Sequence, residues 1–206
     1  MLIDVTMPIR AGAVFRLGTP PVEIATRTFH HESEGGFETV VLSLPAHTAT
    51  HVDLVSKERF VRPERMIGRG HLIDVTSAVG REIQLDSIEA LPVVQSGDFV
   101  LFRTDWSELA GTERYHEHPQ LSLEVVKWLV ATRVNAVGID APGLGRGRRH
   151  TEFDKLLADK DILVIENLAN LRAVRQTEFT VYCLPLSIER VDAIPARVLV
   201  ELPENP

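Results

Sequence analysis

Short apolar runs, separated by polar and turn-forming residues, recur along the chain and predict a fold rich in β-strands. About eight such runs have the length and the β-branched character of strands. They span residues 2–5, 39–44, 71–75, 98–103, 136–139, 162–165, 180–184 and 198–202. Apolar residues spaced for one face of a helix occur in fewer places, so we expect strands to outnumber helices.

Three segments carry helical signals. From residue 122 to about residue 133, valines and a leucine fall on one helical face, and Ser122 is suited to cap the first turn. Residues 86–91, followed by Pro92, predict a short helix, because proline cannot continue one. Residues 151 to about 158 predict another helix.

The order of these elements indicates an α/β protein with a single mixed sheet. Residues 125–165 read as helix, strand, loop, helix and strand, which favours a βαβ-like unit with parallel pairing. The remaining strands favour antiparallel or mixed pairing. No repeat, Ser/Gly linker or low-complexity tract divides the 206 residues, so we expect one domain, residues 1–206.

Composition narrows the classes of function. Hydrophobic residues make up 44% and charged residues 25%, as in ordinary globular proteins. A net charge of -7 disfavours nucleic acid, and Arg146, Arg148 and Arg149 are interpreted as a solvated turn. The single cysteine, Cys183, cannot form an intramolecular disulfide. Since no secretory signal or membrane-length apolar run is visible, we expect a cytoplasmic protein without membrane contact.

Candidate chemistry concentrates in residues 44–53, Leu-Pro-Ala-His-Thr-Ala-Thr-His-Val-Asp. Because side chains alternate along an extended chain, His47, His51 and Asp53 would share one face, with the small Ala49 between them. Two imidazoles and a carboxylate are a usual ligand set for Zn²⁺ or Mn²⁺. The alternative is that these histidines only occupy polar positions on a half-exposed strand.

The same residues resemble a family signature. The sequence from His47 to Asp53 is similar to the H-x-G-T-H-x-D-x-P-x-H motif of the cyclase family, whose best-known members are bacterial kynurenine formamidases. Further stretches resemble the family in the expected order, at residues 3–8, 97–106, 136–142 and 165–168. Because these matches extend over nearly the whole chain, it is identified as a member of that family.

The resemblance implies a metal-dependent hydrolase with a swivelling-type α/β fold, assembled as a homodimer or larger. Such an enzyme cleaves an amide, lactone or similar carbonyl bond of a small molecule through metal-activated water. By this resemblance His47, His51, Asp53 and Glu166 hold a first ion, Zn²⁺ or Mn²⁺, and the two carboxylates are able to bridge to a second. Glu166 also ends an expected strand, at the edge where α/β sheets place ligands.

The chain departs from the family pattern at several positions. Ala49, Val55 and Lys57 stand where the family has glycine, proline and a catalytic histidine. An unperturbed lysine stays protonated and cannot act as a base, so the catalytic role implied for Lys57 is to donate a proton or stabilise an oxyanion. Twelve residues before Glu166, where the family usually has a second-metal histidine, stands Asp154.

These departures leave alternatives open. Lys57 and Asp154 could pair in place of a second ion, or Asp154 could itself be a metal ligand, giving one or two ions per chain. His150 would share a helical face with Asp154 if that helix begins early enough, and could serve as a ligand or proton carrier. Asp140 orients a ligand or forms a turn, and Trp106 lines a pocket or fills the core. The same departures also fit a non-catalytic metal-binding member.

Overall fold

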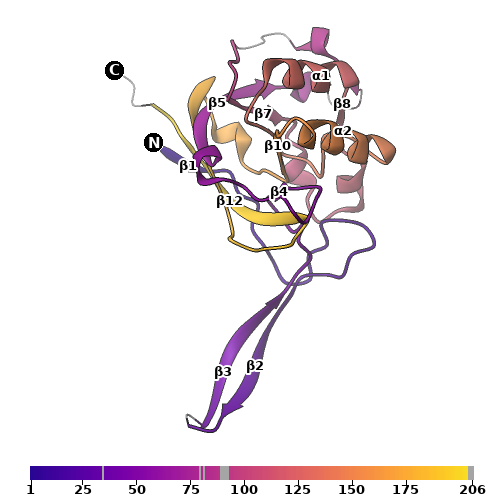
Figure 1. Ribbon diagram of the computed structural model, residues 1–206. Coiled ribbons are helices and arrows are strands. Elements are labelled where there is room, and N and C mark those ends of the chain that lie inside the picture. The colour runs from indigo at the N-terminus through magenta and orange to yellow at the C-terminus, as the bar shows by residue number, and fades with distance from the viewer. Residues whose placement is uncertain (34, 79, 81, 89–92, 204–206) are drawn as a thin grey trace.

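A closed, seven-stranded sheet forms the body of the protein (Figure 1). The computed structural model describes residues 1–33, 35–78, 80, 82–88 and 93–203. The seven strands of this sheet are β4 (His51–Asp53), β5 (Ile67–Asp74), β7 (Phe99–Arg103), β9 (Ala136–Ile139), β10 (Leu163–Glu166), β11 (Glu178–Pro185) and β12 (Ala193–Glu201), and an eighth strand, β1 (Leu2–Asp4), pairs with the sheet. They run in the order β12-β11-β5-β7-β9-β10-β4, and β4 pairs with β12 to close the ring. β1 adds to β12, and the Met1 amine donates to Leu202 O at 3.1 Å.

Two helices, α1 (Leu123–Thr132) and α2 (Arg148–Ala158), lie side by side against one side of the sheet (Figure 1). β5, β7, β9 and β10 pair in parallel, and α2 connects β9 with β10. The other pairings in this sheet are antiparallel, which confirms the mixed α/β class. Ser122 caps α1 as expected, since its Oγ accepts from Val125 N–H at 3.3 Å.

Shorter elements complete the fold. β6 (Glu82–Ile83) and β8 (Gln120–Leu121) form a small parallel pair. Single 3₁₀ turns lie at Pro63–Arg65, Thr76–Ala78, Leu85–Ser87, Trp106–Leu109, Glu113–Glu117 and Leu171–Ala173. Within the described ranges, no helix has the length and apolar character needed to cross a bilayer.

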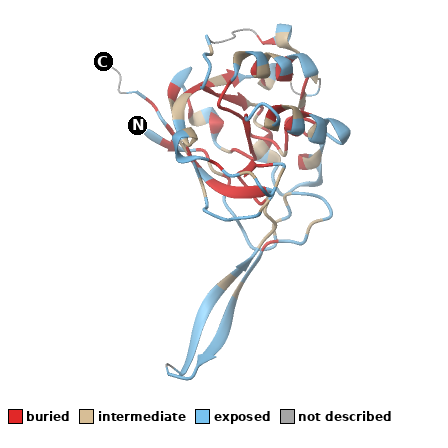
Figure 2. Cartoon of the chain, viewed as in Figure 1, coloured by how far each residue is buried: buried red, intermediate tan, exposed pale blue. Residues whose placement is uncertain are grey.

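Successive side chains of the central strands point to opposite faces of the sheet, and this divides the hydrophobic core into two parts. On β7, Phe99 and Leu101 pack inside the closed sheet, whereas Val100 and Phe102 pack toward the helices. All four side chains are fully buried. Figure 2 shows this buried core running through the body of the molecule. The uninterrupted apolar run of β7 therefore reflects burial on both faces, as in other parallel sheets.

A long hairpin, β2 (Glu23–His31) and β3 (Gly35–Ser43), projects from the body and is largely exposed (Figure 2). Its second strand overlaps the strand expected at residues 39–44, but β2 was not predicted. Residues paired across strands share a face, so Ile24 and Leu42 lie on one face and Phe29 and Phe37 on the other. Apolar side chains are thus exposed on both faces of the hairpin.

Two sequence expectations need correction. Residues 47–53 are not extended throughout: β4 begins only at His51, and Ala49 turns the chain with a φ of 50°. At the helix expected over residues 86–91, only the 3₁₀ turn Leu85–Ser87 is present, and Ile88 is extended. Residues 89–91 of that expected helix lie outside the described part of the chain.

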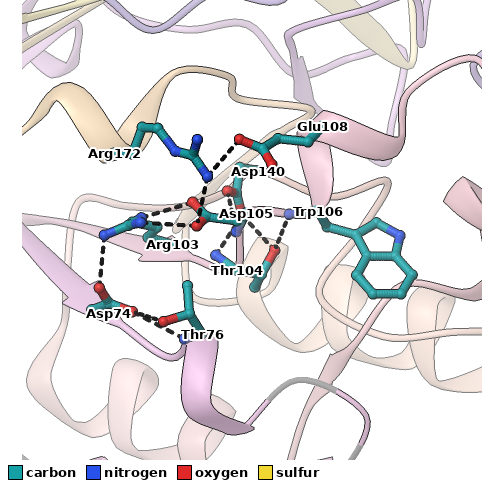
Figure 3. A network of polar contacts seen from close by, with 9 residues as sticks. All are labelled: Asp74, Thr76, Arg103, Thr104, Asp105, Trp106, Glu108, Asp140 and Arg172. Atoms are coloured by element: carbon teal, nitrogen blue, oxygen red, sulfur yellow. Dashed lines mark hydrogen bonds and ion pairs between the residues drawn. The ribbon is translucent and has the colours of Figure 1, made fainter.

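Asp140, which follows β9, fixes the turn that follows β7 (Figure 3). Its buried carboxylate accepts from Thr104 N–H at 2.8 Å, from Thr104 Oγ1 at 2.6 Å and from Asp105 N–H at 2.9 Å. Arg103 then joins Asp105 to Asp74 on the exposed side of the same turn, with 2.8 Å contacts to both. Asp140 therefore holds together the carboxyl ends of two neighbouring strands.

We expect Asp140→Ala to destabilise the protein by about 2–4 kcal/mol, because three donors lose their acceptor in a largely buried turn. The measurement is urea unfolding followed by circular dichroism. Asp74→Ala is the matched control in the same network, and its half-exposed carboxylate should contribute less than about 1 kcal/mol. Equal losses in the two variants would contradict the role of Asp140.

Candidate metal centre

Strand register brings His51 and Glu166 together. β4 runs antiparallel to β10, with His51 directly opposite Glu166, so both side chains leave the same face of the sheet. His51 Nε2 lies 3.2 Å from Glu166 Oε2. Burial opposes a charge on His51, but the contact with Glu166 outweighs it and raises the pKa of the imidazole. Without a cation, this arrangement is a buried ion pair.

His47 joins them from the turn before β4. Its Nδ1 lies 3.2 Å from His51 Nε2 and 3.8 Å from Asp53 Oδ2. Burial, together with the neighbouring imidazole of His51, lowers the pKa of His47. One nitrogen from each histidine and one Glu166 oxygen lie within 4.8 Å of one another, close enough to coordinate one ion.

A second group of donors shares Glu166 with the first. It consists of Asp53, His150, Asp154 and Glu166, whose ligand atoms also lie within 4.8 Å of one another. α2 begins at Arg148, three residues earlier than expected, so His150 is helical and faces Asp154 across one turn, with Nε2 3.3 Å from Oδ2. His150 Nδ1 is 3.8 Å from Glu166 Oε1.

Three carboxyl groups are buried close together in this centre. Asp53, Asp154 and Glu166 are exposed by only 6%, 4% and 2%. Burial, followed by the charges of Glu166 and Asp53, raises the pKa of Asp154 to about 9. Asp154 Oδ1 and Glu166 Oε1 are buried without a hydrogen-bond partner. Buried carboxylates normally pair or coordinate metal, so the donor set fits a divalent cation.

Gly143 leaves room beside these donors. A Cβ atom at this position would collide with His150 Nδ1 and would lie 3.2 Å from Glu166 Oε1. Any larger residue would therefore force His150 to shift and would crowd Glu166.

Lys57 does not enter the centre. Its side chain is exposed and lines a separate groove with Phe60 and Leu186. The structure contains no ion pair between Lys57 and Asp154, both of which are described residues, so, of the two alternatives left open by the sequence, the pairing is absent. The positive charge that acts on Asp154 comes instead from Arg16, in the loop before the hairpin.

A chain of buried hydrogen bonds orients His51. Tyr115 Oη donates to Asn167 Oδ1 at 2.6 Å, and Asn167 Nδ2 donates to Ala49 O at 3.0 Å. The same carbonyl lies 2.9 Å from His51 Nδ1, which must donate, so Nε2 faces the donor group. Sequence analysis missed both orienting residues. Asn167 lies in the stretch of residues 165–168 that resembles the family, but nothing in the sequence marked Tyr115.

A pocket of about 300 Å³ opens over His51 and Glu166. Phe15 and Arg16 contribute from the loop before the hairpin, and Arg146 from the loop before α2. Its wall also contains His116 and His118, two histidines that the sequence analysis did not single out. Trp106 is buried against Tyr115, donating from Nε1 to its carbonyl at 2.8 Å, and is not among the residues lining this pocket.

Val55 adopts a left-handed backbone conformation, with φ of 63°, which is unusual for a β-branched residue. This conformation directs its N–H to Asp53 Oδ1, at 2.8 Å. The local strain therefore helps to orient a candidate ligand. A proline at this position, as in the family motif, could neither adopt this φ nor donate the hydrogen bond.

We expect Val55→Pro to lower the free energy of unfolding by about 2–4 kcal/mol, because φ is incompatible and a hydrogen bond is lost. Val55→Gly, the control, keeps the N–H and tolerates the positive φ, so it should be neutral or stabilising by about 1 kcal/mol. Denaturant unfolding of both variants provides the measurement. A well-tolerated proline would show that the loop adopts another conformation.

Known proteins resemble this chain in sequence and in fold. The cyclase family model, described as "Putative cyclase", matches residues 3–146. The kynurenine formamidase of Erythrobacter litoralis is 27% identical over 176 residues, covering 79% of this chain and 77% of that protein. The solved structure of a potential metal-dependent hydrolase with cyclase activity is 28% identical, with a TM-score of 0.79 over 97% of this chain and 98% of the other.

An isatin hydrolase bound to the product analogue thioisatinate has a TM-score of 0.80 over 98% of this chain and 92% of its own, at 21% identity, and supports the fold alone. The matches at higher identity, together with the two donor groups, support a metal-dependent hydrolase with a divalent metal. The family model covers well over half of the sequence. The chain therefore belongs to the cyclase family.

Proposed function

We propose that this protein hydrolyses an amide or closely related carbonyl bond of a small anionic molecule, using Zn²⁺ or Mn²⁺. The observation that carries this proposal is the pair of buried donor groups that share Glu166 at the floor of a pocket. Similarity to proteins named kynurenine formamidase favours a carbon–nitrogen bond. When bound, a divalent cation supplies Lewis-acid chemistry, polarising a carbonyl and making water more acidic.

Two sets of residues that share Glu166 would hold the metal. His47, His51 and Glu166 would hold one ion, and Asp53, His150, Asp154 and Glu166 a second, so that His150 and Asp154 together take over the position of the family's second-metal histidine. This arrangement makes Asp154 a ligand and leaves no role in the centre for Lys57. The link from Asn167 through Ala49 O to His51 would keep the imidazole in the tautomer that metal binding requires.

Two arginines favour a substrate that carries a negative charge. Arg16 and Arg146 line the pocket above the donor groups, and both are exposed enough to meet an incoming ligand. Guanidinium groups bind carboxylates strongly and with defined geometry. Among the described lining residues, Phe15 is the sole phenylalanine, tyrosine or tryptophan. We therefore propose a compact substrate with a carboxylate rather than an extended aromatic one.

The test is a panel of formanilides, lactones and cyclic imides, each with and without a carboxylate, assayed with added Zn²⁺ or Mn²⁺. We expect metal-dependent turnover, faster for the carboxylated probes, that falls by more than about 100-fold in His51→Ala. Glu113→Ala, at an exposed residue outside both the pocket and the hairpin, is the control. A protein that binds metal but hydrolyses none of the probes would be the non-catalytic family member.

We further propose a homodimer in which each hairpin packs against the partner. An isolated two-stranded hairpin is only marginally stable in water, and this one exposes Phe29, Phe37 and Leu42. Nine-residue strands extend about 30 Å. One hairpin face then has an area of about 300 Å². Each of the two arms would bury that area of its own surface and an equal area of the partner, so the dimer would bury about 1,200 Å² in total, the lower end of a stable interface. Light scattering should give a dimer, and Phe37→Glu a monomer; a monomeric parent would refute this assembly.

A further inference from the structure

A second buried histidine points into the pocket from outside the donor groups. His118 follows the 3₁₀ turn Glu113–Glu117 and is only 5% exposed. Its Nδ1 lies 2.9 Å from Pro119 O. A carbonyl oxygen only accepts, so Nδ1 carries the hydrogen and Nε2 retains a lone pair. Within the described residues Nε2 has no hydrogen-bond partner, although the side chain lines the same pocket as His51 and Glu166.

The surroundings hold this imidazole in place and keep it neutral. Pro119 restricts the backbone of His118 to an extended conformation. Leu121 N–H donates to Leu144 O at 2.8 Å, which ties the segment to the loop before α2. Burial lowers the pKa of His118 to about 4; the Pro119 carbonyl and the charge of Glu166 act in the opposite sense, while those of His150 and Arg146 add to the lowering.

The other candidates for proton transfer are less suitable. Lys57, at the position of the family's catalytic histidine, is exposed and outside the pocket. His150 faces Asp154 and belongs to the second donor group. His116 is only half-buried and packs edge-on against Tyr115, with ring centroids 5.9 Å apart. His118 alone among these combines a fixed tautomer with an uncommitted nitrogen in the pocket.

We propose that His118 is the catalytic residue that transfers the proton during hydrolysis, in place of the histidine that the family has at position 57. This inference rests on the proposed hydrolase function. As a water oxygen bonds to the substrate carbonyl carbon, His118 Nε2 accepts one water proton. As the carbon–nitrogen bond breaks, the same Nε2 returns that proton to the leaving nitrogen. The products are a carboxylic acid and an amine, so the histidine ends the cycle in its starting state.

The experiment compares His118→Gln with the control Glu113→Gln, at an exposed residue of the preceding 3₁₀ turn that does not line the pocket. Glutamine keeps a polar group near the position of Nε2 but cannot exchange a proton at neutral pH. We expect kcat of His118→Gln to fall by about 100-fold or more. KM and the number of bound metal ions should remain those of the parent, and Glu113→Gln should retain parental kcat. In His118→Gly, added imidazole should restore part of the lost activity, which a purely structural role would not allow.

A readout independent of turnover follows the imidazole itself. In nitrogen-labelled protein, NMR should show His118 as the neutral Nδ1–H tautomer at pH 7. A charged ring, the opposite tautomer, or a His118→Gln kcat within about threefold of an active parent would overturn the inference. A parent inactive on every probe would overturn the hydrolase function and this inference together, whereas an active parent with an unaffected His118→Gln overturns only the role of His118.

Discussion

Glu166→Gln should abolish tight binding of divalent metal and, with it, hydrolysis. The Glu166 carboxylate belongs to both donor groups, so one substitution removes a ligand from each. Glutamine has nearly the same shape but no charge, and its amide nitrogen cannot coordinate. Loss of a group that only supports a ligand weakens metal binding by about 10–100-fold, so loss of this shared ligand should exceed about 100-fold.

Titration calorimetry and elemental analysis of purified protein measure this effect. Glu178→Gln, on the exposed start of β11, is the matched control and should keep the metal affinity and stoichiometry of the parent. The two binding steps should both weaken in Glu166→Gln, because neither donor group is complete without it. A variant that still binds the parental number of ions at parental affinity would remove Glu166 from the centre.

Asp154→Asn should stabilise the metal-free protein while weakening the metal-bound one. In the chelated protein Asp154 lies buried beside Glu166 and Asp53, and its pKa is raised to about 9. The folded state therefore holds a proton there that the unfolded chain releases near its usual pKa of about 4. Folding stability from this group is greatest below about pH 4, falls as pH rises, and levels off above about pH 9. Asparagine has no carboxyl proton to release, so this fall in stability with rising pH is absent from the variant.

We expect the gain in unfolding free energy for chelated Asp154→Asn to be about 1–3 kcal/mol at pH 8 and to vanish near pH 4. With saturating Mn²⁺ or Zn²⁺ the order should reverse, because only the parent offers the carboxylate ligand. Urea unfolding with and without chelator at both pH values tests this. Asp159→Asn, just past the end of α2, serves as the control. A variant less stable than the parent in every condition would contradict the charge argument.

Local sequence patterns predicted much of the sheet, and their failures have physical causes. The strand at residues 136–139 was predicted to the residue because β9 is buried on both faces and consists of apolar residues. β2 was missed because threonine, arginine and histidine interrupt its apolar positions, and its pairing partner β3 rather than a core supports it. Hairpin pairing depends on two segments at once, which a scan of single runs does not detect.

The sequence predicted which residues belong to the candidate centre better than it predicted their arrangement in space. The alternation argument assumed an extended chain through His47, but Ala49 is left-handed and the turn brings the imidazole back toward His51. His150 entered the second group because α2 begins early, as the sequence had left open. His118 could not be found from spacing, since its place in the pocket follows from contacts between distant loops.

Because β1 pairs with β12, residues near the two ends of the described chain lie close enough to be joined by a short linker. Met1 and Leu202 are hydrogen-bonded neighbours, and neither the candidate ligands nor His118 lie in the β2–β3 hairpin. A circularly permuted gene, with a short linker across residues 1 and 202 and new termini between β2 and β3, would keep every one of these side chains on unbroken polypeptide. Such a permutant would test whether the centre forms independently of the order in which its residues are synthesised.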